Sequence, residues 1–312
     1  MNHTMFELNG RIGHENGLTC RQLAEDSHPL QIKITGNAEG YPLHLATNFV
    51  NKALKLEPSE TTLLLEHAVV TERSVPVLYC YPKSDTPLPT VLFIHGMTGD
   101  KVMDLDKGIQ LAQNGFFVVL IDVRWHGERK HPQFHSYFYD NDKQTNCRRF
   151  FETIHETVED VIALLDHVQK DSRVDPNRLG MSGISMGGYI SFATAARDRR
   201  IKAIAPMIAS PDWNVNTESL DPNEYVPELQ SLVNFHNPMN HYQRLYSIPL
   251  LVQNGVIDRV INISGVRKLH QLVTQECGEL PKGYIYIEYP EVGHTATSEM
   301  LNQMVTFFRS YL

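Results

Sequence analysis

Residues 178–196 read RLGMSGISMGGYISFATAA, and this stretch decides the fold of the chain. Its first part, 178–183, has the length and apolar character of a buried strand, whereas 186–197 has the character of a helix. The turn between them, 183–187, fits the pattern G-x-S-x-G. A serine in a sharp strand-to-helix turn is pushed out of the sheet, and small residues are needed beside it because strand and helix pass closely. The stretch therefore predicts that Ser185 is presented at the end of a strand.

On both sides of this stretch, predicted strands alternate with predicted helices. Apolar runs of strand length occur at 63–71, 75–81, 90–94, 116–121, 202–209, 249–254 and 284–289. Apolar residues with helical spacing occur at 104–114, 150–169, 262–276 and 296–311. The alternation predicts an α/β fold with a mostly parallel central sheet and helices on both faces. In such a sheet the functional site lies at the carboxyl ends of the strands.

A histidine at this sheet edge is the predicted base for Ser185. A serine hydroxyl is a poor nucleophile until a base removes its proton. His294 directly follows the predicted strand 284–289, so it is expected at the same edge as Ser185. The other downstream histidines lie in an insertion or in a predicted helix: His236, His241 and His270. Position in the fold therefore favours His294.

The acid that orients this histidine follows from the same rule. Asp258 is the only carboxylate between the predicted strand 249–254 and the helix 262–276. The resulting chain order of serine, aspartate and histidine is that of hydrolases with a G-x-S-x-G turn. Asp258 has two alternative roles, as a helix N-cap or as a partner for Arg259, because Asp is a favoured capping residue.

Two backbone amides are predicted to stabilise an oxyanion. One belongs to Met186, which follows the serine, and the other to Met97, in the HGMTG segment after the strand 90–94. Both are main-chain donors, so the identity of the side chains matters little. His126, which follows the next strand near the rim of the predicted pocket, has two alternative roles: it contacts substrate or it fixes the conformation of its loop, and the motif favours the second.

Two insertions interrupt the alternation. Residues 211–248 separate two strands that need only one helix between them, and 128–149 are rich in aromatic and polar residues. Long insertions at the carboxyl edge of a sheet form lids or pocket walls. We therefore predict a small cap in 211–248. Three aromatic side chains of the insertions are predicted to line the substrate pocket, with a place in the apolar core as the equally frequent alternative: Trp213, Tyr137 and Phe138.

The regular pattern begins at about residue 62 and divides the chain. Residues 62–312 are predicted to form the catalytic domain, and 1–61 an N-terminal extension with one short amphipathic helix near 49–56. The extension is too short for a substantial second domain. We expect it to pack on the core, to cover the site, or to join two copies of the chain in a homo-oligomer.

A series of motifs resembles one family. In order they are VPVLYCYP (75–82), LPTVLFIHGMTG (88–99), IDVRWHGE (121–128), GISMGG (183–188), NGVIDRV (254–260) and GH (293–294). Over residues 62–312 this series resembles the α/β-hydrolases, in the bacterial esterase branch related to dienelactone hydrolase and to the catalytic domain of prolyl oligopeptidase. The resemblance implies a carboxylester hydrolase without a metal or organic cofactor. Ser185 departs from dienelactone hydrolase, which has a cysteine there, and 1–61 cannot form the N-terminal propeller of the oligopeptidases.

Composition excludes several classes of function. The net charge of −8 argues against a nucleic-acid partner. The four cysteines are scattered, without the spacing of a disulfide framework or a zinc site, so no metal is expected. No basic and then apolar pattern marks a signal peptide, and no apolar run reaches the roughly 20 residues that span a bilayer. We therefore expect a cytoplasmic protein without a membrane partner.

Three kinds of function fit these observations. The favoured one is hydrolysis of small to medium carboxylic esters by Ser185, through an acyl-enzyme. A second stays within enzymes and comprises acyl transfer, thioester cleavage and peptidase activity of the prolyl oligopeptidase type. The third is a non-catalytic binding module on a hydrolase scaffold, although binding alone does not require a complete set of serine, aspartate and histidine.

Overall fold

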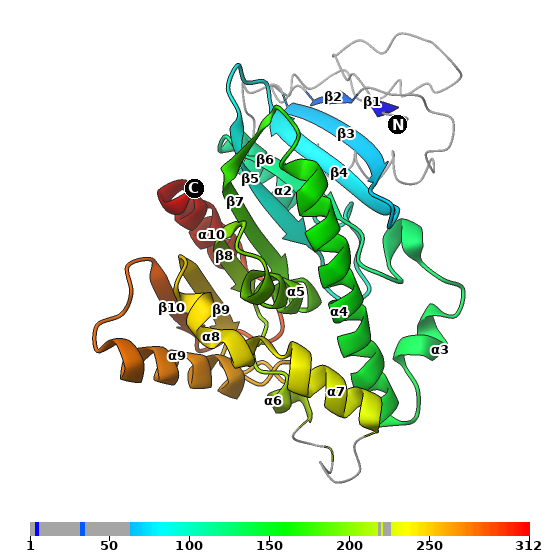
Figure 1. Ribbon diagram of the computed structural model, residues 1–312, viewed down its shortest axis with the longest axis vertical. Helices are drawn as coiled ribbons and strands as arrows, with labels where there is room; N and C mark the ends of the chain where they lie inside the picture. Colours follow the sequence, from blue (N-terminus) through cyan, green and yellow to red (C-terminus); the bar gives the residue numbers. More distant parts are fainter. Residues whose placement is uncertain (1–3, 6–31, 35–62, 218–219, 221–225) are drawn as a thin grey trace.

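The computed structural model describes residues 4–5, 32–34, 63–217, 220 and 226–312 (Figure 1). The helix expected near 49–56 lies outside these residues, so the predicted roles of the N-terminal extension stay predictions. Within the described part, ten strands form one sheet in the order β1-β3-β4-β6-β5-β7-β8-β9-β10, with β2 beside β3. Neighbouring strands from β6 through β10 are parallel, whereas β4 is antiparallel to both of its neighbours.

Strands β3 to β10 fall close to the predicted positions, whereas β1 and β2 lie in the N-terminal extension, where no strand is predicted. The bounds of these strands are Thr4–Met5 (β1), Ile32–Ile34 (β2), Leu63–Val70 (β3), Val75–Pro82 (β4), Leu88–Ile94 (β5), Phe117–Ile121 (β6), Val174–Ile184 (β7), Ile201–Met207 (β8), Leu250–Gly255 (β9) and Tyr284–Tyr289 (β10). The mostly parallel α/β sheet predicted from the sequence is thus confirmed.

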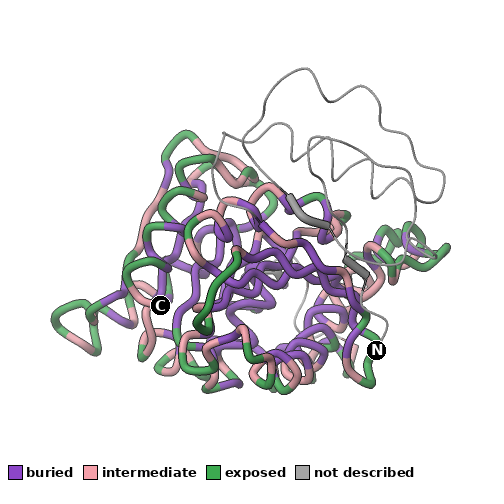
Figure 2. The backbone as a smooth tube through the Cα atoms, turned by 90° about the horizontal axis from the view of Figure 1, so that it is seen from above, coloured by how far each residue is buried: buried purple, intermediate pink, exposed green. Residues whose placement is uncertain are grey.

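Both faces of the sheet are buried, because successive side chains of each strand point to opposite sides. On β5, Leu92 and Ile94 belong to one apolar core, and Val91 and Phe93 to the other. Parallel strands that are covered on both faces consist of nearly continuous apolar runs, which is the pattern seen at 90–94. Figure 2 shows the buried strands enclosed by helices whose outer turns are exposed.

Helices form a layer on each side of the sheet. One core includes side chains of Lys143–Val168 (α4), Met186–Arg197 (α5), Pro227–His236 (α7), Tyr242–Tyr246 (α8) and Ser264–Cys277 (α9). The other includes side chains of Leu105–Gln113 (α2) and Ser298–Tyr311 (α10). In Figure 1, α2 and α10 lie behind the sheet and the other five helices in front of it. The remaining helices are short: Gly127–Arg129 (η1), Phe134–Phe138 (α3), Asn214–Thr217 (α6) and Pro238–His241 (η3).

The start of α4 differs from the prediction, because this helix begins at Lys143 rather than at 150. Its first two turns are polar and carry no apolar spacing that would reveal them. Asp142 caps the helix, and its carboxylate accepts hydrogen bonds from the amides of Gln144 and Thr145. The insertion expected at 128–149 is accordingly shorter than predicted.

The second insertion, 211–248, contains α6, α7, η3 and α8. Of these, α7 packs against α4, and α8 packs against α5 and α9. The role of this segment as a cap stays a prediction. In the described part of the chain, no helix has both the length and the hydropathy needed to cross a membrane.

Candidate active site

Ser185 occupies the sharp turn between β7 and α5. Its backbone has φ 53° and ψ −114°, in the left-handed half of conformational space, where non-glycine residues are uncommon. Such a conformation costs about 1–3 kcal/mol and persists only where surrounding contacts hold it. One of these contacts is the hydrogen bond that the Ser185 amide donates to the Met207 carbonyl, at 3.0 Å. The turn therefore holds the serine at the carboxyl end of the parallel strands.

Two glycines allow the chain to pass this close to the serine. A Cβ atom on Gly187 would lie 2.0 Å from the carbonyl oxygen of Ile94, so no side chain fits there. A Cβ atom on Gly96 would lie 3.6 Å from the Cβ of Ser185. The loop that follows β5 therefore runs directly beside the serine.

His294 and Asp258 meet Ser185 from two other strand ends. The loop after β10 carries His294, whose Nε2 lies 3.0 Å from the Ser185 Oγ. The turn after β9 carries Asp258, whose Oδ2 lies 2.8 Å from the Nδ1 of His294. The structure thus brings together three side chains that are 36 and 73 residues apart in the sequence. The arrangement is a continuous hydrogen-bond relay from carboxylate to imidazole to hydroxyl.

The carboxylate and the imidazole of this relay have different environments. The side chain of Asp258 is fully buried, whereas that of His294 is 27% exposed. The second carboxylate oxygen, Oδ1, accepts hydrogen bonds from the amides of Val260 and Ile261 at 2.8 and 2.9 Å. Asp258 therefore organises the turn before α9, although the N-cap of α9 is Ile263. The same carboxylate fixes its own loop with one oxygen and the histidine with the other.

The two amides predicted for an oxyanion hole lie at the start of α5 and in the loop after β5. Met186 is the first residue of α5, where backbone N–H groups have no partner within the helix. In the described part of the chain, neither this amide nor that of Met97 donates a hydrogen bond. The helix N-terminus also favours negative charge nearby. Both amides are thus available to an anionic oxygen bound beside Ser185.

His95 supports the loop that carries Met97, a role that the sequence analysis missed. Its ring is buried, and Nδ1 lies 2.7 Å from the Gly96 carbonyl oxygen. The amide of Val123 donates to Nε2 at 3.0 Å. Nδ1 therefore carries the proton and donates it to the Gly96 carbonyl. The only signal in the sequence was a histidine directly after a strand and before a glycine.

The three predicted pocket residues lie in aromatic clusters. The buried ring of Trp213 stacks on Phe151 of α4, with centroids 4.5 Å apart. Tyr137 stacks on Trp125 at 3.9 Å, and Phe138 packs edge-on against Tyr137 at 4.9 Å. These ring contacts account for the burial of Trp213 and Phe138 even when no substrate is bound. Their part in a substrate pocket stays a prediction.

Metal ligands do not gather anywhere in the described ranges. No group of three or more His, Cys, Asp or Glu side chains there has the arrangement of a metal site.

Comparison with known proteins agrees with this geometry. Residues 85–235 match the family described as serine aminopeptidase, S33. Esterase YjfP of Escherichia coli (strain K12) is 28% identical over 250 residues, which cover 76% of this chain and 96% of that protein. The family and the relative both support a hydrolase.

Two solved structures share the fold. TT1662 from Thermus thermophilus has a TM-score of 0.65 at 19% identity, over 79% of this chain and 97% of that one. A putative dienelactone hydrolase from Klebsiella pneumoniae has a TM-score of 0.58 at 16% identity, over 80% of this chain and 99% of that one. The chain therefore has the α/β-hydrolase fold, and the resemblance inferred from its motifs is confirmed.

Proposed function

We propose that this α/β-hydrolase is a serine carboxylesterase that acts on small to medium carboxylic esters. The observation that carries the proposal is the relay in which Asp258, His294 and Ser185 are joined by hydrogen bonds of 2.8 and 3.0 Å. A base within hydrogen-bond reach of a hydroxyl, and an acid within reach of that base, are the requirements for a serine nucleophile. The relationship to esterase YjfP supports an ester as the substrate.

The hydrogen bonds determine which nitrogen of His294 carries the proton. A carboxylate only accepts hydrogen bonds, so Asp258 favours the tautomer in which Nδ1–H donates to its Oδ2. Nε2 is then unprotonated and accepts the hydrogen bond of the Ser185 hydroxyl. In this tautomer the imidazole is ready to act as a base.

The reaction proceeds in two halves. Nε2 of His294 takes the hydroxyl proton while Oγ of Ser185 attacks the ester carbonyl, and the amides of Met97 and Met186 bind the resulting oxyanion. The carbon–oxygen bond to the alcohol then breaks, and the alcohol leaves with the proton from Nε2. Water attacks the acyl-enzyme in the same way, gives its proton to Nε2, and releases the acid as Ser185 recovers its hydrogen. No other reagent is consumed.

Replacement of the serine tests the proposal. Ser185→Ala should lower kcat for p-nitrophenyl acetate by at least about 10⁴-fold, because loss of a nucleophile removes the acyl-enzyme path. A fluorophosphonate probe should label the wild-type protein at Ser185, as located by peptide mass spectrometry, and should not label the variant. Circular dichroism should show both proteins folded. Turnover by folded Ser185→Ala at the wild-type rate would contradict the proposal.

Peptide hydrolysis is the second candidate, because the matching family is described as serine aminopeptidase. Acetyl esters, thioesters and anilides with the same leaving-group size distinguish these activities, and added alcohols report acyl transfer. We expect kcat/KM to be highest for the esters. Faster turnover of alanine p-nitroanilide than of alanine p-nitrophenyl ester would instead assign a peptidase. A protein that turns over none of them and resists the fluorophosphonate would be a binding module.

A further inference from the structure

Strand β10 forms one edge of the sheet, and within the described part of the chain β9 is its only neighbouring strand (Figure 1). The carbonyl oxygens of Gly283 and Tyr289 accept hydrogen bonds from backbone amides in β9 and directly after it, each at 2.9 Å. Backbone groups of alternate residues in a strand point to the same side. The even-numbered residues between these two, Tyr284, Tyr286 and Glu288, therefore direct their backbone N–H and C=O groups away from β9.

Most of these outward-facing backbone groups have no partner in the described ranges. The amide of Tyr284 donates to the carbonyl of Pro281, at 2.9 Å, within its own loop. The carbonyl of Tyr284 and both backbone groups of Tyr286 and Glu288 form no hydrogen bond with a described residue. An edge strand with free backbone groups is a template on which another extended chain can pair.

The sequence of β10 lacks the devices that usually protect such an edge. Natural sheets protect their edges with Lys or Pro residues, with bulges or with a covering segment. The six residues YIYIEY include no Lys or Pro, and their pairing with β9 has no bulge. The single charged residue, Glu288, is bound by the guanidinium of Arg267 at 2.7 and 2.9 Å. Ile285 is 37% exposed, so the edge is apolar and its one charge is balanced.

We propose that a second copy of the chain pairs its own β10 with this edge, antiparallel and about a two-fold axis at Tyr286, so that the two sheets become continuous. Tyr286 then faces its counterpart and exchanges two backbone hydrogen bonds with it, and the amide of Glu288 donates to the carbonyl of Tyr284 in the other copy. In this register alone, all three outward-facing residues of each strand lie opposite outward-facing residues of the other. The inference is independent of the proposed esterase function.

The side chains of the edge are complementary to a second copy. Ile285 lies opposite Ile287 of the other copy in a pair without hydrogen bonds, where Cα atoms are about 4.5 Å apart and the side chains meet. Antiparallel pairing also brings the start of each strand beside the end of the other. Lys282 lies two residues before β10 and Glu291 two residues after it, and both are exposed. Glu279, the other charged residue of the loop before β10, is five residues from the strand. Opposite charges therefore meet at both ends of the pair.

Two helices flank β10 and widen this surface. On one side, the ring of His270 in α9 stacks on that of Tyr286, with centroids 4.3 Å apart. On the other, α10 lies beside the start of the strand, where a Cβ atom on Gly283 would lie 3.0 Å from the ring of Tyr311. A stable interface buries about 1,200–2,000 Å² in total. One edge strand provides less than this, so the outer sides of α9 and α10 must contribute to the contact.

Light scattering after size-exclusion chromatography tests the pairing. The wild-type protein should have twice the mass of one chain. Ile285→Lys places a charge where the two strands meet and should reduce the mass to that of one chain. Val69→Lys is the matched control, because Val69 is also an exposed apolar strand residue but lies on β3, toward the other edge of the sheet. This variant should keep twice the mass, and circular dichroism should show both variants folded.

Disulfide formation tests the register. Cα atoms that face each other in a hydrogen-bonded antiparallel pair are about 5.5 Å apart, within the range that a disulfide spans. Tyr286→Cys should therefore form a cross-linked dimer on mild oxidation, with the bond located at position 286 by peptide mass spectrometry. Glu288→Cys is the matched control, because the two copies of this position are four residues out of register, roughly 13 Å apart. It should give no cross-link at position 288.

Three results would overturn the proposal. They are a wild-type protein with the mass of one chain, a dimer that folded Ile285→Lys leaves intact, and equal cross-linking of Tyr286→Cys and Glu288→Cys. A dimer that only Val69→Lys dissociates would also overturn it, because the interface would then lie at the other edge of the sheet. If Ile285→Lys does not fold, the difference between the two cysteine variants decides.

Discussion

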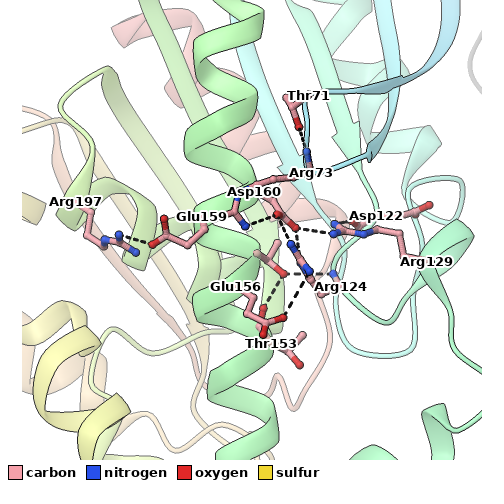
Figure 3. A network of polar contacts seen from close by, with 11 residues as sticks. Thr71, Arg73, Asp122, Arg124, Arg129, Thr153, Glu156, Glu159, Asp160 and Arg197 are labelled. Atoms are coloured by element: carbon pink, nitrogen blue, oxygen red, sulfur yellow. Dashed lines mark hydrogen bonds and ion pairs between the residues drawn. The ribbon is translucent and has the colours of Figure 1, made fainter. Parts of the chain in front are cut away.

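Two polar clusters of this molecule lie beside strand ends of the same sheet. They differ in whether all of their polar groups have hydrogen-bond or ion-pair partners. The first is the relay of Ser185, His294 and Asp258. The second joins the segment after β6 to α4 and is centred on Asp160 (Figure 3). In the first, the serine hydroxyl is bonded to a half-buried histidine, and two nearby amides have no acceptor. In the second, a buried charge is surrounded by its partners.

In the Asp160 cluster, the negative charge of a buried carboxylate is balanced by arginine side chains. The carboxylate is fully buried and binds three guanidinium groups, those of Arg73 at 3.2 Å, Arg124 at 2.7 Å and Arg129 at 2.8 Å. These arginines come from the turn between β3 and β4 and from the loop after β6, as Figure 3 shows. The cluster therefore ties two loops of the fold to α4. Both carboxylate oxygens are occupied, so this carboxylate stabilises the fold and has no oxygen left for chemistry.

The comparison predicts that changes in the first cluster alter catalysis and changes in the second alter stability. The largest expected effect is that of Asp258→Asn. The amide keeps an oxygen for the backbone donors Val260 and Ile261, but turns its NH₂ group toward His294. The imidazole is then held in the wrong tautomer, and kcat for p-nitrophenyl acetate should fall by about 10⁴-fold, equivalent to about 5 kcal/mol.

Denaturant unfolding provides the control for Asp258→Asn. The free energy of unfolding should change by less than about 1 kcal/mol, because the turn keeps both of its backbone hydrogen bonds. A variant that retains most of its turnover would mean that Asp258 acts only as a turn residue, and that His294 is oriented by another group.

The second expected effect is a loss of stability in Asp160→Asn. The substitution leaves Arg73, Arg124 and Arg129 without their shared carboxylate, and breaking a buried ion pair typically costs about 3–5 kcal/mol. We expect about 3 kcal/mol, since the arginines keep some contact with water. Denaturant unfolding measures this loss, and titration with a fluorophosphonate should show that the folded fraction keeps a reactive Ser185.

Glu159→Gln is the matched control for this substitution. Glu159 is the neighbour of Asp160 on α4 and pairs with Arg197 at 2.5 Å, with both side chains about one-third exposed. Exposed ion pairs contribute about 0–1 kcal/mol, so the variant should unfold almost as the wild type does. Equal losses in Asp160→Asn and Glu159→Gln would remove the distinction between the buried cluster and an ordinary surface pair.

The same contrast explains which features could be predicted from the sequence. The proximity of Ser185, His294 and Asp258 could be predicted because each follows a strand, and parallel strands end at one edge of a sheet. Asp160 was not singled out because its partners are distant in the sequence and no local pattern links them. The polar start of α4 was missed because it has no apolar spacing. The part of Trp213 in a substrate pocket stays a prediction, because sequence alone does not show what covers an aromatic ring.

The smallest expected effect concerns two histidines near the site. His294 has a carboxylate partner in Asp258, whereas His126 is buried without a carboxylate bonded to its ring. Burial lowers the pKa of His126 to about 4, from about 6.5 in the unfolded chain. As the pH falls below about 6.5, His126 takes up a proton in the unfolded chain but stays neutral in the folded protein. Acid therefore lowers the free energy of unfolding. The linkage amounts to about 2 kcal/mol at pH 5 and is absent at pH 7.5.

Unfolding of the wild type and of His126→Asn at both pH values measures this contribution. Asparagine takes up no proton, so the variant should lose about 2 kcal/mol less stability between pH 7.5 and pH 5 than the wild type does. His135→Asn, which replaces an exposed histidine of α3, controls for the substitution itself. Equal losses in the wild type and His126→Asn would mean that folded His126 accepts a proton near pH 6. The contrast between the two histidines would then be lost.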